Sequence, residues 1–178
     1  MTGTIYAGAS TPKETRARIQ VICAAYAVAH PTLLKTVAFD NAAALTAAGS
    51  PASGVVVTDC PFDNASMPAL VEITTVGTVQ AEGGGTGQIH ITRNYLLLVL
   101  FYQMCDASVG EQVAALDAAW AKIDELPDYF RSTAVSNHTG LKGSAFDYMT
   151  DGGVEISTWN GGTYSSVIYT LPVTATRR

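Results

Sequence analysis

The residue types that most often carry acid–base or metal chemistry are present in this chain, but they are scattered. The three histidines occur without HxxxH or HxH spacing and without a cysteine at ligand spacing. They are His30, His90 and His138. Structural or surface histidines are the favoured interpretation, so the sequence predicts no metal ion and no cofactor.

The carboxylate and hydroxyl side chains give no stronger indication of catalysis than the histidines do. Two acidic pairs stand close together in the sequence: Asp124 with Glu125, and Asp147 with Asp151. Glycosidase or metal chemistry would require a pair to converge in a cleft, and neither pair is surrounded by further ligand residues. Ser136 and His138 lack the nucleophile elbow and the acid of a hydrolase triad. We therefore predict no catalytic residues and no enzymatic activity.

A glycine-rich stretch, Ala81–Gly87, could resemble a phosphate-binding loop. Such a loop needs a following helix and usually a Gly-Lys-Ser/Thr ending, whereas here a strand follows and no lysine is near. The stretch is better interpreted as the flexible tip of a long antiparallel hairpin. We predict that this tip contacts a neighbouring subunit through Gln80, Ala81, Glu82, Gly83, Gly84, Gly85, Thr86 and Gly87.

Two helices can be located from their start signals. Thr11 and Glu14 form a capping box around a helix-start proline, and this first helix is expected to end near His30. A second capping box is formed by Ser108 and Glu111, and we expect its helix to run to residue 126. Its apolar stripe, at steps of 4, 3, 4 and 3, consists of Val109, Val113, Leu116, Trp120 and Ile123.

Strand-like segments separate and follow these helices. They are expected near residues 69–80, 88–104, 154–159 and 164–174, and Asn160-Gly161-Gly162 predicts a tight turn between the last two. The sequence therefore predicts one α+β domain over residues 1–178. Its sheet is mostly antiparallel, with two main α-helices packed on one face and a long projecting β-hairpin. Residues 1–10 are interpreted as a flexible arm.

The segment Gln88–Met104 is the centre of the predicted sheet. Its second half is apolar on both alternating faces, because Leu97 and Val99 point one way while Leu96 and Leu98 point the other. A strand of this kind is covered on both sides. Helices can cover one face, and the other requires more protein from this chain or from a second copy.

The amino-acid composition favours a second copy of the chain as the cover of that other face. The chain is 48% hydrophobic and only 14% charged, against about 25% charged residues in an ordinary domain. A small chain so poor in charge often buries part of its surface in an assembly. The alternative is a monomer whose apolar count is inflated by alanine.

Charge is unevenly distributed along the chain. No lysine or arginine lies between Lys35 and Arg93, and this interval carries a charge of −5, equal to that of the whole chain. Phosphate contacts depend on lysine and arginine, so direct nucleic-acid binding is not expected. An acidic surface that DNA passes without binding is compatible with this pattern, as is an ordinary solvated acidic face.

Cysteine usage and hydropathy indicate the compartment. Cys23, Cys60 and Cys105 are odd in number and have no metal spacing, so we interpret them as free thiols in a reducing compartment. The N-terminus is unlike a signal peptide, and no apolar run reaches the roughly 18 residues of a membrane span. We expect no membrane association.

The order of elements resembles that of tail terminator, or tail-completion, proteins of long-tailed bacteriophages. The resemblance is carried by the N-terminal helix, PALVEITTVGTVQ, GQIHITRNYLLLVLFYQM, SVGEQVAALDAAWAKIDEL and the closing FDYMTDGGVEISTWNGGTYSSVIYTLPVT. It covers roughly residues 11–175 as a pattern of elements rather than a signature motif. Residues 31–67 are longer and richer in alanine than the family pattern, and we interpret them as an insertion.

The resemblance implies a structural virion protein of the tail and neck region, assembled in the host cytoplasm. Such a protein forms a hexameric ring that caps the tail tube, stops its polymerisation and joins it to the head through a neck or head-completion protein. Its partners would be further copies of itself, the tail tube protein and the neck protein. Genomic DNA would pass through the lumen without specific binding. No catalytic residues are transferred by this resemblance.

Other readings stay open at this point. One is a different ring component of the same particle, such as a head–tail connector or neck protein. A second, of another class, is a small ligand-binding or enzymatic α+β domain, which would require a pocket with converging polar groups. A third is a tail tube subunit, which would consist mainly of strands and would form open-ended stacks.

Overall fold

The computed structural model describes residues 11–39, 56–57, 63–84, 88–104, 108–131 and 144–177. Only the backbone is described at residues 56–57, 76–84, 88–89, 144–145 and 176–177. The predicted arm at residues 1–10 and most of the predicted insertion lie outside the described residues. The predicted alanine-rich helix at residues 41–48 lies outside them as well.

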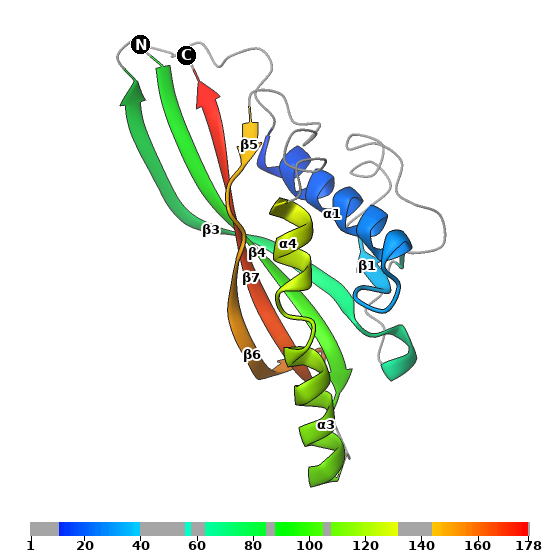
Figure 1. The fold of residues 1–178 in the computed structure, drawn as a ribbon. Coiled ribbons are helices and arrows are strands. Elements are labelled where there is room, and N and C mark those ends of the chain that lie inside the picture. Colours follow the sequence, from blue (N-terminus) through cyan, green and yellow to red (C-terminus); the bar gives the residue numbers. More distant parts are fainter. Residues whose placement is uncertain are drawn as a thin grey trace.

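The described residues form an α+β fold in which helices cover one face of a mixed sheet (Figure 1). The helices are α1 (Pro12–Ala29), α3 (Val109–Trp120) and α4 (Glu125–Arg131), with a short 3-10 turn, η1 (Asn64–Ser66). The strands are β1 (Thr36–Ala38), β2 (Val56–Val57), β3 (Ala69–Gly84), β4 (Gln88–Gln103), β5 (Ser144–Phe146), β6 (Thr150–Trp159) and β7 (Gly162–Arg177). Their order in the sheet is β2-β1-β3-β4-β7-β5, and β6 also pairs with β7.

The sheet is mostly antiparallel, as predicted. β4 lies between β3 and β7 and pairs antiparallel with both, while β1 pairs parallel with β2 and β3. The β3–β4 pairing extends to Gly84 opposite Gln88, but residues 85–87 lie outside the described part of the chain. β7 accompanies β4 as far as Ile89 opposite Arg177. The predicted projecting hairpin is therefore not confirmed, since β4 has a strand on each side over this length.

The capping box at the start of α1 is confirmed. The Thr11 amide donates to Glu14 Oε2 over 2.6 Å, and the Glu14 amide donates to Thr11 Oγ1 over 3.2 Å. These two bonds satisfy backbone donors that have no partner within the helix. At the other end the His30 amide donates to the Tyr26 carbonyl over 2.8 Å, and Pro31 follows. Local signals thus set both ends of α1.

The second helix was predicted as one unit to residue 126, and this is wrong. α3 ends at Trp120, residues 121–124 form a turn, and α4 begins at Glu125. Pro127 lies in the first turn of α4, where its missing N–H would have had no helical acceptor. The change of direction lets Ile123, Leu126 and Phe130 enter the core, where each is at most 5% exposed. Burial of these three side chains outweighs the lost helical hydrogen bonds.

The main core lies between the helices and one face of the sheet. It contains Ile19, Cys23 and Tyr26 of α1, Leu126 and Phe130 of α4, and Leu97, Val99, Tyr169 and Leu171 of β4 and β7. The opposite face carries a smaller cluster without helical residues: Met67, Ala69, Val71, Leu100 and Tyr164. The central strand thus contributes to both clusters, as its doubly apolar pattern predicts.

Candidate functional site

The structure brings together no catalytic group among the residues it describes. No three histidine, cysteine or acidic side chains are placed to hold a metal ion within this part of the chain. Asp147 accepts a hydrogen bond from the Tyr148 amide at 2.8 Å, and Asp151 accepts one from the Gly153 amide at 3.1 Å. Asp147 therefore bonds the backbone of its own connecting segment, and Asp151 stabilises the irregularity in the β6–β7 pairing between Asp151 and Val154. Ser136 and His138 lie outside the described residues.

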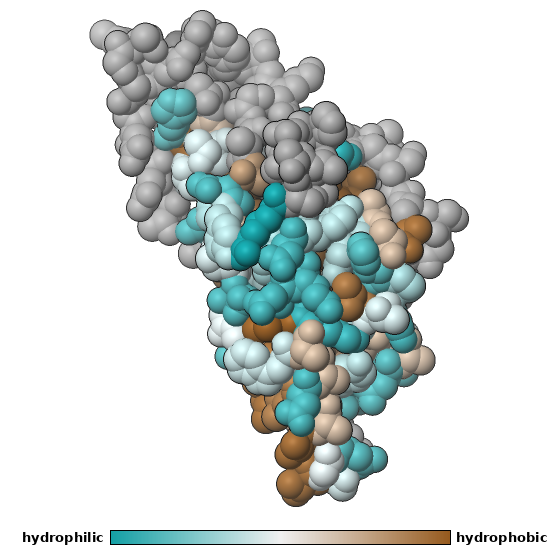
Figure 2. All heavy atoms as spheres, in the orientation of Figure 1, coloured by the Kyte–Doolittle hydropathy of each residue, from teal (hydrophilic) through white to brown (hydrophobic). Residues whose placement is uncertain are grey.

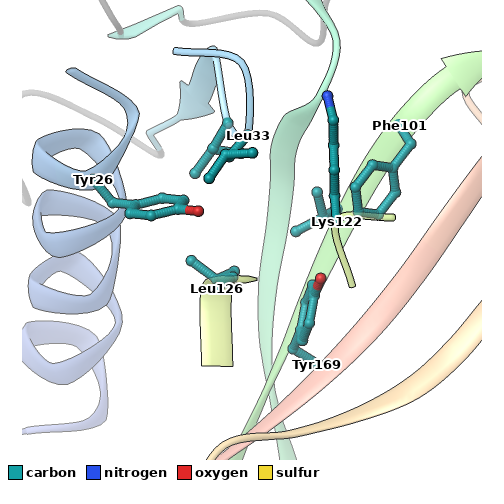
Figure 3. Close-up of a pocket in the computed structure, with 8 residues that line it drawn as sticks. Tyr26, Leu33, Phe101, Lys122, Leu126 and Tyr169 are labelled. Carbon is teal, nitrogen blue, oxygen red and sulfur yellow. The ribbon is translucent and has the colours of Figure 1, made fainter. Parts of the chain in front are cut away.

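A small cavity lies between α1, α4 and the sheet (Figure 3). It encloses about 10 Å³, which is room for one water molecule and far less than an organic substrate needs. Its lining residues are Tyr26, Leu33, Leu34, Val99, Phe101, Lys122, Leu126 and Tyr169. The Lys122 ammonium donates to the Thr32 carbonyl and points away from the Tyr26 hydroxyl in Figure 3. The cavity therefore offers no site for substrate chemistry.

Near this cavity, burial shifts the pKa values of two groups, Glu125 and Tyr26. The Tyr26 hydroxyl and Glu125 Oε2 are buried and have no hydrogen-bond partner among the described residues, whereas the Tyr169 hydroxyl donates to the Ile123 carbonyl over 3.0 Å. Burial raises the pKa of Glu125, against the opposing effect of Lys122 and His30. Burial and then the Glu125 charge raise the pKa of Tyr26. The ionised form of Glu125 is thus disfavoured in the folded protein.

This raised pKa predicts how stability depends on pH at Glu125. The folded state holds the proton more tightly than the unfolded chain, whose glutamate pKa is about 4.3. As pH rises from that value through the folded pKa, the folded state loses stability. Glu125→Gln should therefore raise the free energy of unfolding at pH 7 by at most about 1 kcal/mol, because solvent screens this partly exposed carboxylate, and the gain should disappear below pH 4.

Urea unfolding at several pH values measures this difference. Asp124→Asn, at the exposed neighbouring position, is the matched control and should change stability by less than about 0.5 kcal/mol at pH 7. A Glu125→Gln variant less stable than the parent at pH 7 would contradict the prediction.

The predicted intersubunit residues fall into two groups. Gln80–Gly84 continue β3 and pair with β4, from Gln80 opposite Thr92 to Gly84 opposite Gln88. Gly85, Thr86 and Gly87 lie outside the described residues. β1 pairs only with Ala69 and Leu70 of β3, so beyond these two residues no described strand pairs with the outer edge of β3.

α3 contacts β4, β6 and β7, in agreement with its predicted packing on the sheet, but much of its apolar stripe is exposed. Val109 is 77% exposed, Val113 52% and Trp120 55%, and only Ala119 of this helix is buried. The helix extends past the strands at one end of the molecule (Figure 1), where Figure 2 shows hydrophobic side chains at the surface. Periodicity identified the stripe correctly, but it could not show how much of the stripe the sheet leaves exposed.

A second apolar surface lies on the sheet face opposite the helices. Leu96 and Leu98 of β4 and Ile168 of β7 are partly exposed there. Leu98 lies opposite Ile168, and Leu96 opposite Thr170. No described helix packs on this face. The α3 stripe is largely exposed, and this sheet face is partly exposed beside the smaller buried cluster. We call them the two uncovered apolar surfaces because no described helix packs on either.

No protein-family model matches this sequence, and no curated protein matches it. Of the helices described, none has the length and hydrophobicity needed to span a membrane.

Proposed function

We propose that this chain is a structural virion protein, a tail terminator of a long-tailed bacteriophage. In this proposal it forms a hexameric ring that caps the tail tube, stops its polymerisation and joins it to the head or neck. The observation that carries the proposal is the pair of uncovered apolar surfaces on one small α+β chain. Surfaces of this kind are typical of subunits that are completed by an assembly.

The element order supports the particular family. The resemblance rests on an N-terminal helix, a long antiparallel strand pair, a helix and closing strands, and the described residues contain these elements in that order. The two capped helices favour a terminator over a tail tube subunit, which would consist mainly of strands.

The outer edge of β3 supports a contact near Gln80–Gly87. Backbone N–H and C=O groups along an unpaired strand edge are a template for strand addition. Within Gly77–Gly84 there is no lysine, arginine or proline that would discourage pairing. We therefore keep this segment as the proposed intersubunit contact, reached by an adjacent protomer in the ring.

The acidic interval between Lys35 and Arg93 is compatible with a ring whose central channel lets DNA pass. If part of it faces the channel, its negative charge repels DNA phosphates and leaves the genome free to move. Partners in this proposal are the tail tube protein and a neck protein, and neither a cofactor nor a membrane is involved.

A tube-capping experiment tests the proposal. The purified protein is added to polymerising tail tube protein from the same phage, and the products are examined by electron microscopy. We expect tubes to stop growing and to carry a six-fold ring at one end. Tubes of unchanged length together with a protein that stays monomeric at every concentration would refute it, and a ring found against the portal would favour a head–tail connector.

A deletion tests the hairpin contact separately. Removing Gly83–Gly85 should weaken ring formation while leaving the monomer folded, as judged by circular dichroism. Asp124→Asn, at an exposed position outside this segment, is the control, which should assemble normally. Normal assembly of the deletion variant would rule out this segment as an intersubunit contact.

A further inference from the structure

α3 contacts β4, β6 and β7 of its own sheet, and its one buried side chain lies in its last turn. Ala119 is fully buried, and a Cβ atom added at Gly153 of β6 would lie 3.8 Å from Cη2 of Trp120. Trp120 thus rests one edge on β6 and leaves more than half of its surface exposed. Val109 and Val113, further out along the helix, are more than half exposed. A stripe with 4-3-4 spacing is the pattern that packs against another protein surface.

Charges beside the stripe restrict the partner. α3 carries Glu111 and Asp117 and no lysine or arginine, so its charge is −2. α1 carries Lys13, Arg16 and Arg18 against Glu14, so its charge is 3 − 1 = +2, and all four residues lie in its first two turns. Lys13 is exposed, whereas Arg16 and Arg18 are partly buried and the Arg16 guanidinium donates to the Ile73 carbonyl. The acidic helix and the basic start of α1 are therefore electrostatically complementary.

The two surfaces belong to different ends of one molecule. α3 forms one end, whereas α1 begins in the opposite half, near β5 (Figure 1). One copy cannot bring its own α3 to its own α1 start without unfolding. Two α3 helices facing each other would place like charges together, which opposes a two-fold contact.

We infer that the exposed apolar stripe of α3 docks on a second copy of this chain, at the basic surface around Lys13 at the start of α1. The contact joins two different patches, so it is head-to-tail and closes into a ring when the rotation between copies permits. The inference rests on the proposed function only in taking a second copy as the partner, and it names the surfaces that meet.

Substitution at the stripe tests the apolar part of the contact. Val113→Lys should weaken self-association at least about tenfold, because it places a positive charge in a desolvated interface opposite the basic start of α1. Val28→Lys is the matched control, since both valines lie on helices and are 52% exposed. Sedimentation velocity measures the association, and equal urea midpoints establish that both variants are folded. Equal association of the two variants would overturn the inference.

A charge exchange tests the identity of the second surface. Asp117→Lys and Lys13→Glu change two exposed residues, and each variant alone should assemble less well than the parent. A one-to-one mixture of the two should recover assembly. In the mixture, the unchanged acidic α3 of the Lys13→Glu copy meets the unchanged basic α1 start of the Asp117→Lys copy, and the two altered surfaces, each with zero net charge, meet each other. Failure of the mixture to recover would overturn the inference, and so would tighter binding of Asp117→Lys to the parent protein than of the parent to itself.

Fluorescence of Trp120 gives an independent readout. In a Trp159→Phe background its emission should shift to shorter wavelength as concentration rises and the ring forms, because the indole leaves water. Constant emission across assembly would contradict docking at α3. A parent protein that never assembles would refute the proposed function as well, whereas normal assembly that ignores every α3 variant would refute this inference alone.

Discussion

Truncation of Leu97 to alanine is expected to destabilise the protein by about 2–5 kcal/mol. Leu97 is 0% exposed at the centre of β4, and its cross-strand neighbours are Ile73 of β3 and Tyr169 of β7. Removing the end of its side chain leaves a cavity in the main core. The surrounding side chains of the sheet and of α1 and α4 are packed together and cannot fully close it. The free energy of unfolding in urea, measured at a concentration where the protein is monomeric, gives the size of the loss.

The adjacent residue is the matched control. Leu98→Ala removes the same atoms from the same strand, but its side chain lies on the sheet face opposite the helices and is partly exposed. Its loss should be smaller, since part of this side chain is already in contact with water in the folded protein. Equal losses at the two positions would indicate that both faces of β4 are covered to the same extent in the monomer.

Replacement of Gly162 by alanine should cost about 1–3 kcal/mol through overpacking. A Cβ atom there would lie 2.6 Å from Cε2, 2.7 Å from the hydroxyl oxygen and 2.9 Å from Cζ of Tyr164. The Tyr164 side chain is 0% exposed, so its ring cannot swing into solvent to make room. We expect a lower midpoint of thermal unfolding and weaker protection of β6 amides from hydrogen exchange.

Gly110 provides the contrasting substitution. A Cβ atom at this position in the first turn of α3 meets nothing within 4 Å. Gly110→Ala should leave stability unchanged or raise it by up to about 1 kcal/mol, because alanine reduces the freedom of the unfolded chain and favours helix. A destabilised Gly110→Ala variant would show that α3 is crowded where the structure leaves it open.

Local features of the fold were predictable because they depend on neighbours in sequence. The capping boxes at Thr11 and Ser108 form as expected, and each joins a side chain to a backbone amide three residues away. The turn between β6 and β7 was likewise predicted from Asn160 and Gly161, which adopt positive φ angles of 46° and 82°. No distant contact is needed to determine any of these features.

The break between α3 and α4 could not be predicted in this way. Helical periodicity continues from Val109 to Ile123, so the sequence supports one uninterrupted helix. The chain turns at residues 121–124 because a straight continuation would carry Leu126 and Phe130 away from the core they fill with α1. The energy that decides this comes from contacts with a helix at the other end of the sequence.

For the two uncovered apolar surfaces, too, one part could be predicted from local pattern and another part could not. Alternation in β4 and the 4-3-4-3 spacing of α3 determined, from the sequence by itself, which side chains share an apolar face, since strand and helix geometry alone sets that grouping. Only the tertiary structure decided which of those faces is covered. α1 and α4 pack on one side of β4, while Leu96, Leu98 and the stripe of α3 stay partly or largely exposed. Whether an apolar face is packed against other elements depends on the path of the whole chain. That path is determined by contacts between residues far apart in the sequence, which a local pattern does not reveal.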